Sequence, residues 1–171
     1  HLLRCFDDDN IVHVEGGVDP IRDKDIIDTE LQFTDLEVLE RFRDRTMKTT
    51  KGGNKEPLRI VAIADKIIAH ISQGKNARTL ELEEEEWEVV KDLGLLTLKP
   101  VLYCCNVDEA GLPDGNEMVE RVREMIKDED AEIMVICAAY EAELVELDDP
   151  ADRQEFLESV GLSKPGLFTV I

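Results

Sequence analysis

The sequence has few aromatic residues and no long apolar run. Only 5% of its 171 residues are aromatic, and no apolar stretch approaches the ~20 residues that a membrane-spanning helix needs. The opening residues, HLLRCFDDDN, lack an initiator methionine, a basic segment and a long apolar segment. We therefore expect neither a signal peptide nor a natural start at this point, and no membrane association.

Basic residues are also scarce. The chain carries 20 Lys and Arg against 40 Asp and Glu, which gives a formal charge of -20. Because 43% of the residues are hydrophobic and apolar stretches recur throughout, the composition is typical of a globular rather than a disordered chain. We expect a soluble, acidic protein long enough for one good core.

No C-x-x-C pair is present among the four cysteines. Cys5, Cys104, Cys105 and Cys137 all lie in or beside apolar stretches, where a free cysteine behaves as a small buried hydrophobe. This usage predicts a reducing, cytoplasmic setting. Adjacent residues on a strand point to opposite faces, so Cys104 and Cys105 are poorly placed for a metal or redox site, and we assign no metal ligands.

The first half of the sequence reads as a series of helices. Asp19-Pro20 is a helix start followed by IRDKDIIDTELQF, and the capping-box pattern Thr34 to Glu37 predicts a second start. Gly52-Gly53-Asn54 ends that helix, and Pro57 begins another, whose apolar stripe is Ile60, Ile63, Ala64, Ile67 and Ile71. These features predict two antiparallel helices joined by a glycine turn, although periodicity alone fits two ordinary core helices equally well.

Charge in this region is opposite to that of the rest of the chain. Between Arg41 and Arg59 there are seven basic and two acidic residues, so this stretch is +5 and the remainder is -25. A basic tip on an acidic body suits contact with a polyanion such as ribosomal RNA, and the alternative is a solvated helix face. The candidate partner-binding residues are Arg41, Arg43, Arg45, Lys48, Lys51, Lys55 and Arg59.

The second half of the sequence has the pattern of a parallel sheet. The acidic residues 83–86 suit the start of a helix that ends at Gly94. KPVLYCCN then predicts a buried strand, DGNEMVERVREMIKDED a helix, and AEIMVICAA a second buried strand, which together form a β–α–β unit. Asp149-Pro150 predicts a last helix through Glu158.

Polar and small residues follow both of these strands. In parallel sheets ligands bind beyond the carboxyl ends of the strands, where Asn106 to Glu109 and Cys137 to Ala139 are expected. An Asn there can tie neighbouring loops together, a carboxylate can accept hydrogen bonds from a purine, and small residues allow close backbone approach. The alternative is that Asn106 and Glu109 only form turns.

The end of the predicted strand KPVLYCCN and the residues after it, YCCNVDE, together with the small residues after the next strand, resemble the base-recognition half of a P-loop GTPase. In that pattern Asn-Lys-x-Asp follows one strand and a Ser-Ala-type motif follows the next. Here Val107 replaces the Lys and Glu109 the Asp, a departure that resembles the Obg-like ATPase family of the YchF type. Similarity extends over the segments RCFDDDNIVHVEGGVDPIRDKDIIDTELQFTDLE, LTLKPVLYCCNVDE, CAAYEAELVELDD and GLSKPGLFTVI, in family order.

This resemblance implies a fold and a division into domains. The expected fold is α/β, a partial P-loop NTPase (Rossmann-like) parallel sheet with an inserted α-helical coiled-coil hairpin. Residues 1–33 and 83–171 would belong to the nucleotide-binding domain, and residues 34–82 would form the inserted hairpin. By the same resemblance, Asn106 orders the base-binding loops, Val107 adds backbone and apolar contact, and Glu109 discriminates between bases. The second loop would be Cys137, Ala138 and Ala139.

Phosphate-binding motifs are absent from these residues. There is no G-x-x-x-x-G-K-[ST] and no D-x-x-G pattern, so nucleotide hydrolysis cannot be assigned to them and no catalytic residue is named. Acid–base chemistry by Asp7, Asp8, Asp9 or His13 lacks a partner nucleophile. We expect an internal portion of a longer protein, with the P-loop and a C-terminal TGS domain lying outside it.

Two hypotheses for the function follow. In the first, the longer protein is a cytoplasmic, ribosome-associated enzyme that hydrolyses ATP, or also GTP, with the help of Mg²⁺. This portion then supplies base recognition and a partner-binding arm, and by itself it binds no cofactor and is inactive. In the second, the hairpin is a noncatalytic module that binds the ribosome or RNA.

Overall fold

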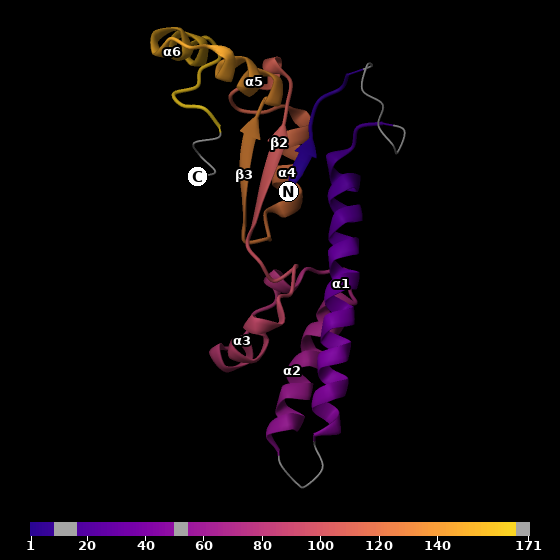
Figure 1. Ribbon diagram of the computed structural model, residues 1–171. Helices are drawn as coiled ribbons and strands as arrows, with labels where there is room; N and C mark the ends of the chain where they lie inside the picture. Colours follow the sequence, from indigo (N-terminus) through magenta and orange to yellow (C-terminus); the bar gives the residue numbers. More distant parts are fainter. Residues whose placement is uncertain (9–16, 50–54, 167–171) are drawn as a thin grey trace. The chain divides into compact units, whose positions relative to one another are not determined.

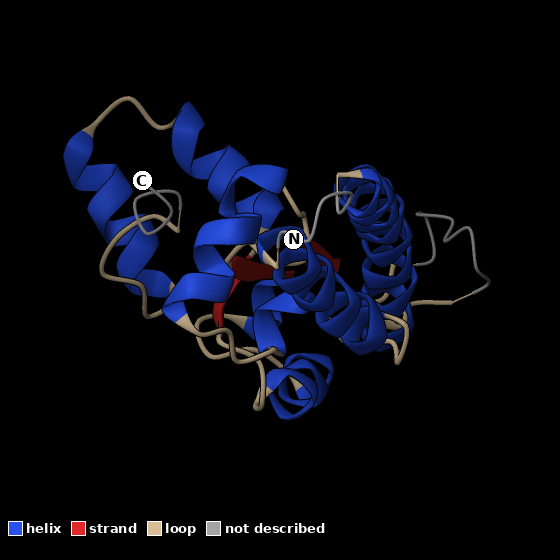
Figure 2. Cartoon of the chain, turned by 90° about the horizontal axis from the view of Figure 1, so that it is seen from below, coloured by secondary structure: helices blue, strands red, loops and turns tan. Residues whose placement is uncertain are grey.

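The computed structural model describes residues 1–8, 17–49 and 55–166, which divide into two compact units. We call residues 1–24 together with 101–171 the sheet unit, and residues 25–100 the helical unit. Helices predominate in the chain, and the strands form one small sheet (Figure 2). Among the described residues, no helix has the length and apolar character needed to cross a membrane.

The sheet unit is built on three parallel strands in the order β1-β2-β3 (Figure 1). The register pairs Leu3 with Cys105 and Cys105 with Val135. The elements are β1 (Leu2–Arg4), β2 (Val101–Asn106), the short 3₁₀ helix η3 (Glu109–Gly111), α4 (Glu117–Ile126), β3 (Ala131–Ile136), α5 (Ala138–Glu146) and α6 (Pro150–Ser159). The β–α–β unit and the α/β fold class predicted from the sequence are therefore confirmed.

An apolar core joins the sheet to α4. Alternate residues of a strand share a face, so Tyr103 and Cys105 of β2 are both buried on the side that also holds Val119 and Val122 of α4. Asn116 caps the start of α4, because its side-chain oxygen accepts hydrogen bonds from the backbone N–H groups of Met118 and Val119. The strands consequently have a fixed support on one face, and their carboxyl ends remain available to form a site.

The helical unit contains most of α1 (Pro20–Lys48), and then α2 (Glu56–Ile71), η1 (Ala77–Thr79), α3 (Glu84–Val90) and η2 (Lys91–Leu93). The helices α1 and α2 lie side by side (Figures 1 and 2) and pack through a core that includes Leu39, Ile63 and Ile67. The predicted apolar stripe of α2 is buried apart from Ile60, which is partly exposed. The glycine turn predicted at residues 52–54 lies outside the described residues.

The helix start predicted at Thr34 is wrong, because α1 is continuous from Pro20 to Lys48. The Thr34 hydroxyl donates to the carbonyl of Glu30 at 3.1 Å, so it is satisfied inside the helix instead of capping a new one. The residue beside it, Asp35, is 1% exposed and accepts hydrogen bonds from residues far along the chain. That long-range pairing has no signature in the local sequence.

The limits of the two units differ from the predicted domain boundaries. The units meet at residues 24/25 and 100/101, whereas the sequence suggested 33/34 and 82/83. The difference arises because residues 25–33 continue α1 into the helical unit, and because Leu95 joins its core. The assignment of residues 34–82 as an inserted hairpin remains a prediction.

A buried polar network distinguishes the helical unit. The Asp35 carboxylate accepts three hydrogen bonds of 2.7 Å, from the backbone N–H of Leu96 and from the backbone N–H and hydroxyl of Thr97. A second buried set links Gln32 to Asn76 at 2.9 Å and Asn76 to Asp28 at 3.0 Å. These bonds tie α1 to the segments before and after α3.

Candidate functional site

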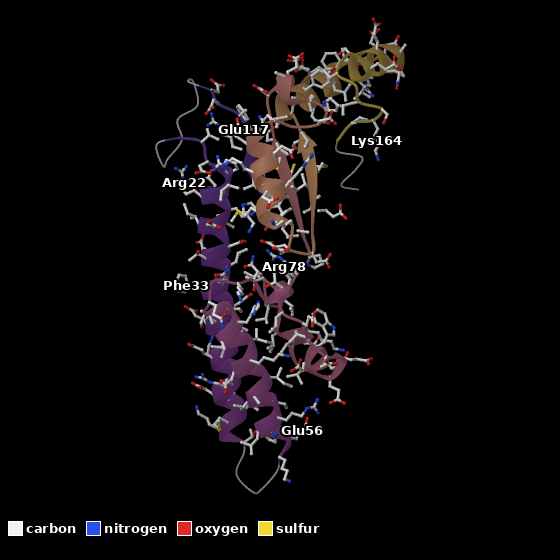
Figure 3. The ribbon with its side chains drawn as sticks, turned by 180° about the vertical axis from the view of Figure 1, so that it is seen from behind. Arg22, Phe33, Glu56, Arg78, Glu117 and Lys164 are labelled. Atoms are coloured by element: carbon white, nitrogen blue, oxygen red, sulfur yellow. The ribbon has the colours of Figure 1, made fainter. Side chains whose placement is uncertain are left out.

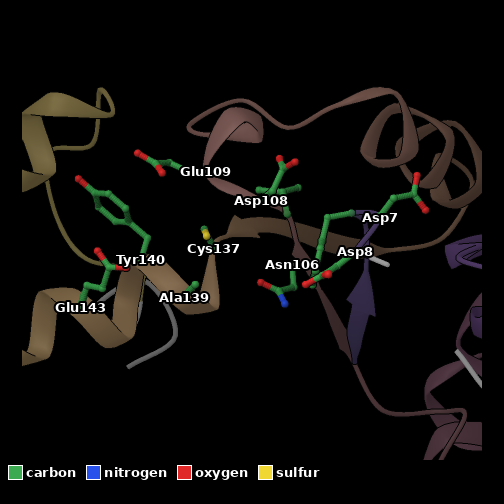
Figure 4. A pocket seen from close by; sticks show the side chains of 11 residues that line it. Asp7, Asp8, Asn106, Asp108, Glu109, Cys137, Ala139, Tyr140 and Glu143 are labelled. Carbon is green, nitrogen blue, oxygen red and sulfur yellow. The ribbon is translucent and has the colours of Figure 1, made fainter. Parts of the chain in front are cut away.

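A cavity of about 320 Å³ lies at the carboxyl ends of the strands in the sheet unit (Figure 4). Three segments contribute to it, each directly following one of the three strands. The lining residues are Phe6, Asp7, Asp8, Asn106, Val107, Asp108, Glu109, Cys137, Ala139, Tyr140 and Glu143. Its volume falls at the lower end of the range of about 300–1,000 Å³ that small-molecule sites occupy.

The structure brings together all the residues that the sequence singled out at the strand ends. Five of the six line the cavity, namely Asn106, Val107, Glu109, Cys137 and Ala139. The sixth, Ala138, does not line it, but its backbone N–H donates to the side-chain oxygen of Asn106 at 2.9 Å. Asn106 therefore joins the segment after β2 to the first turn of α5.

Backbone hydrogen bonds on both sides of β2 hold Asn106 in place. Its carbonyl accepts from the N–H of Cys5 at 2.7 Å, and the N–H of Val107 donates to the carbonyl of Ile136 at 2.8 Å. Each bond continues the pairing of β2 with a neighbouring strand beyond the strand's last residue. The base of the cavity is consequently an extension of the sheet itself.

The two carboxylates that follow Val107 have different roles. Asp108 caps the short helix η3, because its side chain accepts a hydrogen bond from the N–H of Gly111 at 3.1 Å. A side chain at Gly111 would place its Cβ 2.8 Å from the Cβ of Val107, so the tight turn requires glycine. The side chain of Glu109 is exposed and has no hydrogen-bond or ion-pair partner within the described ranges, which leaves its carboxylate able to accept from a ligand.

Six lining residues were not named as site residues from the sequence: Phe6, Asp7, Asp8, Asp108, Tyr140 and Glu143. The rule that placed Asn106 also applies to the end of β1, so it could have identified the segment from Phe6 to Asp8. Tyr140 and Glu143 belong to α5, whose apolar pattern is too weak to have predicted a helix.

Tyr140 gives the cavity an apolar wall because its hydroxyl is hydrogen-bonded to α6 and only its ring is left to face a ligand. The hydroxyl donates to the carbonyl of Phe156 and lies 2.9 Å from the side-chain oxygen of Ser159, both on α6. The ring stacks on Phe156 with the centroids 4.1 Å apart. These contacts also fix α6 against α5.

Three of the four cysteines are buried, and Cys104 is partly exposed. A hydrogen bond with Cys105, together with burial, raises the pKa of the Cys5 thiol, and burial raises the pKa of Cys104. All four cysteines are free, and Cys137 contributes its buried side chain to the cavity. Within the described ranges, no cluster of three His, Cys, Asp or Glu residues is arranged to hold a metal ion.

The basic residues of the helical unit fall into two groups. Arg41, Arg43 and Arg59 each form ion pairs with acids of the same unit, the shortest being 2.8 Å between Arg59 and Glu85. Arg45, Lys48 and Lys55 are exposed and have no ion pair with any described residue. Lys51 lies outside the described residues.

The acidic run 83–86 begins α3, as the sequence predicted. Glu83 and Glu86 form a reciprocal capping box, and Glu86 also pairs with Lys66 at 2.6 Å. The run lines a second cavity of about 620 Å³, together with Arg59, Ala62 and Ile63. Three of its four acids, Glu83, Glu85 and Glu86, are thus committed to the helix start or to ion pairs with α2.

Comparison with known proteins supplies the family. No protein-family model matches the chain. Curated proteins named ribosome-binding ATPase YchF are similar over the whole chain: those of Haemophilus influenzae and Bacillus subtilis are each 42% identical, over 171 and 173 residues. Over its whole length the chain is similar to proteins of the YchF family.

A solved structure, that of the Schizosaccharomyces pombe YchF GTPase, agrees with this assignment. It matches 99% of the chain with a TM-score of 0.84 and 28% sequence identity. The chain spans 47% of the length of the two YchF relatives and 47% of the solved chain. The resemblance to the Obg-like ATPase family of the YchF type is therefore confirmed, and so is the P-loop NTPase fold class.

Proposed function

We propose that the cavity of the sheet unit binds the base of a purine nucleotide, with a preference for adenine. The observation that carries this proposal is the 2.9 Å hydrogen bond from the N–H of Ala138 to the side chain of Asn106. It holds together the two loops that the resemblance assigns to base recognition. The apolar side of Val107 and the ring of Tyr140 add walls suited to a flat aromatic ligand.

The residues at the rim favour adenine over guanine. Guanine presents two adjacent N–H donors, which a short, well-placed Asp can accept together, whereas adenine presents one exocyclic donor beside a ring acceptor. Glu109 stands where the GTPase pattern has that Asp, and its longer, unpaired side chain is less suited to a rigid double contact. Val107 in place of Lys removes a further polar contact to the base.

The longer protein is then a ribosome-associated nucleotide hydrolase. The YchF relatives are named as ribosome-binding ATPases, and the yeast structure is named as a GTPase. Hydrolysis of ATP or GTP would need Mg²⁺ and a phosphate-binding loop, and these 171 residues contain no G-x-x-x-x-G-K-[ST] sequence to supply one. This chain contributes base selection to such an enzyme and is inactive on its own.

The test is nucleotide binding by the protein at its full natural length, measured by calorimetry with ATP and with GTP. We expect ATP to bind more tightly, and Asn106→Ala to weaken ATP binding by at least about tenfold, since the two loops lose their link. Gln154→Ala removes an exposed amide on α6 and is the matched control, expected to leave binding unchanged. Absence of saturable binding of either nucleotide would refute the proposal.

A second candidate function is a ribosome or RNA contact made by the helical unit, independent of catalysis. Arg45, Lys48 and Lys55 favour it, because these exposed cations have no acidic partner among the described residues. Cations that are free of internal partners can neutralise phosphates without first breaking an ion pair. Arg41, Arg43 and Arg59 would have to give up such pairs.

The two groups provide a matched experiment. We expect the triple change Arg45→Gln, Lys48→Gln and Lys55→Gln to abolish most ribosome co-sedimentation and to lower the salt dependence of binding by about one unit per residue. The triple change Arg41→Gln, Arg43→Gln and Arg59→Gln alters the net charge equally, and we expect it to have the smaller effect. Equal losses would mean that general charge, not these three residues, makes the contact.

A further inference from the structure

The segment from Phe6 to Asp8 forms one wall of the cavity but belongs to no helix or strand. It follows β1 and Cys5, beyond the last backbone bond that the described residues make between β1 and β2, so strand pairing does not hold it. A wall of this kind keeps its position only if side chains elsewhere bind its backbone. The last residue of β1, Arg4, does this.

Arg4 contacts the segment through its guanidinium group. The Nε of Arg4 donates to the carbonyl of Phe6 at 3.1 Å, and one terminal nitrogen donates to the carbonyl of Asp8 at 3.3 Å. The guanidinium also lies over the Phe6 ring, 4.7 Å from its centroid. A planar fork with several N–H donors can reach two carbonyls and stack on a ring at once, which an ammonium group cannot do.

The position of the charge adds to this argument. Five carboxylates line the cavity (Asp7, Asp8, Asp108, Glu109 and Glu143), and none of the lining residues that the structure describes is basic. Arg4 is itself absent from the lining, so its cation contacts the backbone of the wall without being part of the cavity surface.

We propose that Arg4 is a positioning residue for the base-binding cavity, which holds the Phe6–Asp8 wall through its guanidinium fork. The inference rests on the proposed function, since it assigns Arg4 a role in binding the base of the nucleotide. Arg4 does not touch the ligand in this account. Its effect is confined to the part of the ligand that meets the wall.

The experiment compares ATP with inorganic tripolyphosphate, which carries the phosphates but no base. Both are titrated into the full-length protein and into three variants: Arg4→Gln, Arg4→Lys and the control Arg121→Gln, which removes an exposed arginine paired with Asp19. We expect Arg4→Gln and Arg4→Lys to weaken ATP binding by about tenfold and to leave tripolyphosphate binding unchanged. The control should bind both ligands as the wild type does.

Hydrogen exchange gives a second measurement that a general loss of stability would not reproduce. In both Arg4 variants the amides of Cys5 and Val107, whose hydrogen bonds extend the sheet into the cavity, should exchange faster, while the amides of α4 keep their protection. Thermal unfolding identifies any variant that fails to fold. If Arg4→Gln does not fold, the comparison of Arg4→Lys with the wild type tests the positioning role.

The outcomes separate the two proposals. Wild-type affinity for ATP in Arg4→Lys would overturn the positioning role, since charge alone would suffice. Equal weakening of ATP and tripolyphosphate would overturn it too, because the effect would then not concern the base. If the wild-type protein gains no affinity from the base of ATP, the proposed function itself fails, and the role of Arg4 fails with it.

Discussion

The two units of this chain bury different kinds of residue. Among the described residues, six polar or charged side chains are buried, and five of them belong to the helical unit: Asp28, Gln32, Asp35, Asn76 and Thr97. In the described part of the sheet unit, Lys24 is the one such residue, and it pairs with Glu129 at 2.7 Å. The sheet unit is therefore held mainly by apolar packing, and the helical unit by apolar packing combined with a hydrogen-bonded network.

This difference follows from how each unit fixes the relative position of its own helices and strands. In the sheet unit, backbone pairing fixes the register of the strands, so the interior can be apolar and the polar residues can collect at the strand ends. Two helices packed by Leu39, Ile63 and Ile67 have no such register. The bonds from Asp35 to Leu96 and Thr97 supply it, since a shift of α1 would leave a buried carboxylate unpaired.

The largest predicted effect is on this network. Asp35→Ala leaves the backbone N–H groups of Leu96 and Thr97 without acceptors, so we expect the free energy of unfolding to fall by about 3–5 kcal/mol. Chemical denaturation monitored by circular dichroism measures it. Glu37→Ala, on the exposed side of the same helix, is the control and should cost less than about 1 kcal/mol. A similar cost for both changes would contradict the role given to the network.

An apolar truncation in the sheet unit should cost less. Val122 is fully buried in α4, and Val122→Ala removes two methyl groups from the core, for which we expect about 2 kcal/mol by the same measurement. The exposed neighbour Glu120 provides the control as Glu120→Ala. If Val122→Ala proved costlier than Asp35→Ala, the distinction between the two units would be lost.

The smallest effect concerns pH. Burial lowers the pKa of His70 below its usual 6.5, and its Nε2 lies 2.8 Å from the Thr79 hydroxyl, which itself donates to the carbonyl of Asn76. The folded protein thus favours neutral His70. Its contribution to stability is present above pH 6.5 and is lost as the pH falls toward the lowered pKa.

Thermal unfolding at pH 7 and at pH 5 checks this sign. The wild type should lose slightly more stability over that interval than His70→Gln, which cannot be protonated. The reverse order would show that protonated His70 is the form that the folded state prefers.

The comparison of the two units also explains what the sequence could predict. The succession of β2, α4 and β3 was predicted correctly, because these elements follow each other closely and their patterns are local. The end of the second predicted strand was wrong, since β3 ends at Ile136 and Ala138 begins α5. Asn106 and Glu109 were located by the same rule. The break predicted at Thr34 failed because the hydroxyl bonds within α1 and because the partner of Asp35 lies 62 residues away.

Exposed apolar residues show a further limit of sequence patterns. Phe33 is labelled in Figure 3 and is 65% exposed on α1, although it is among the most hydrophobic residues of that helix. Periodicity indicates that a helix is amphipathic, but it does not say which apolar side chain will find a neighbour.

The carboxylates around the cavity also impose a direction on any ligand that enters it. Asp7, Asp8, Asp108, Glu109 and Glu143 make the electrostatic potential at the opening negative, and a phosphate group is repelled there. If the proposed function holds, a nucleotide enters with its neutral heterocycle leading and its charged phosphates pointing away from the opening. The opening would then select ligand orientation by charge before any hydrogen bond to the base forms.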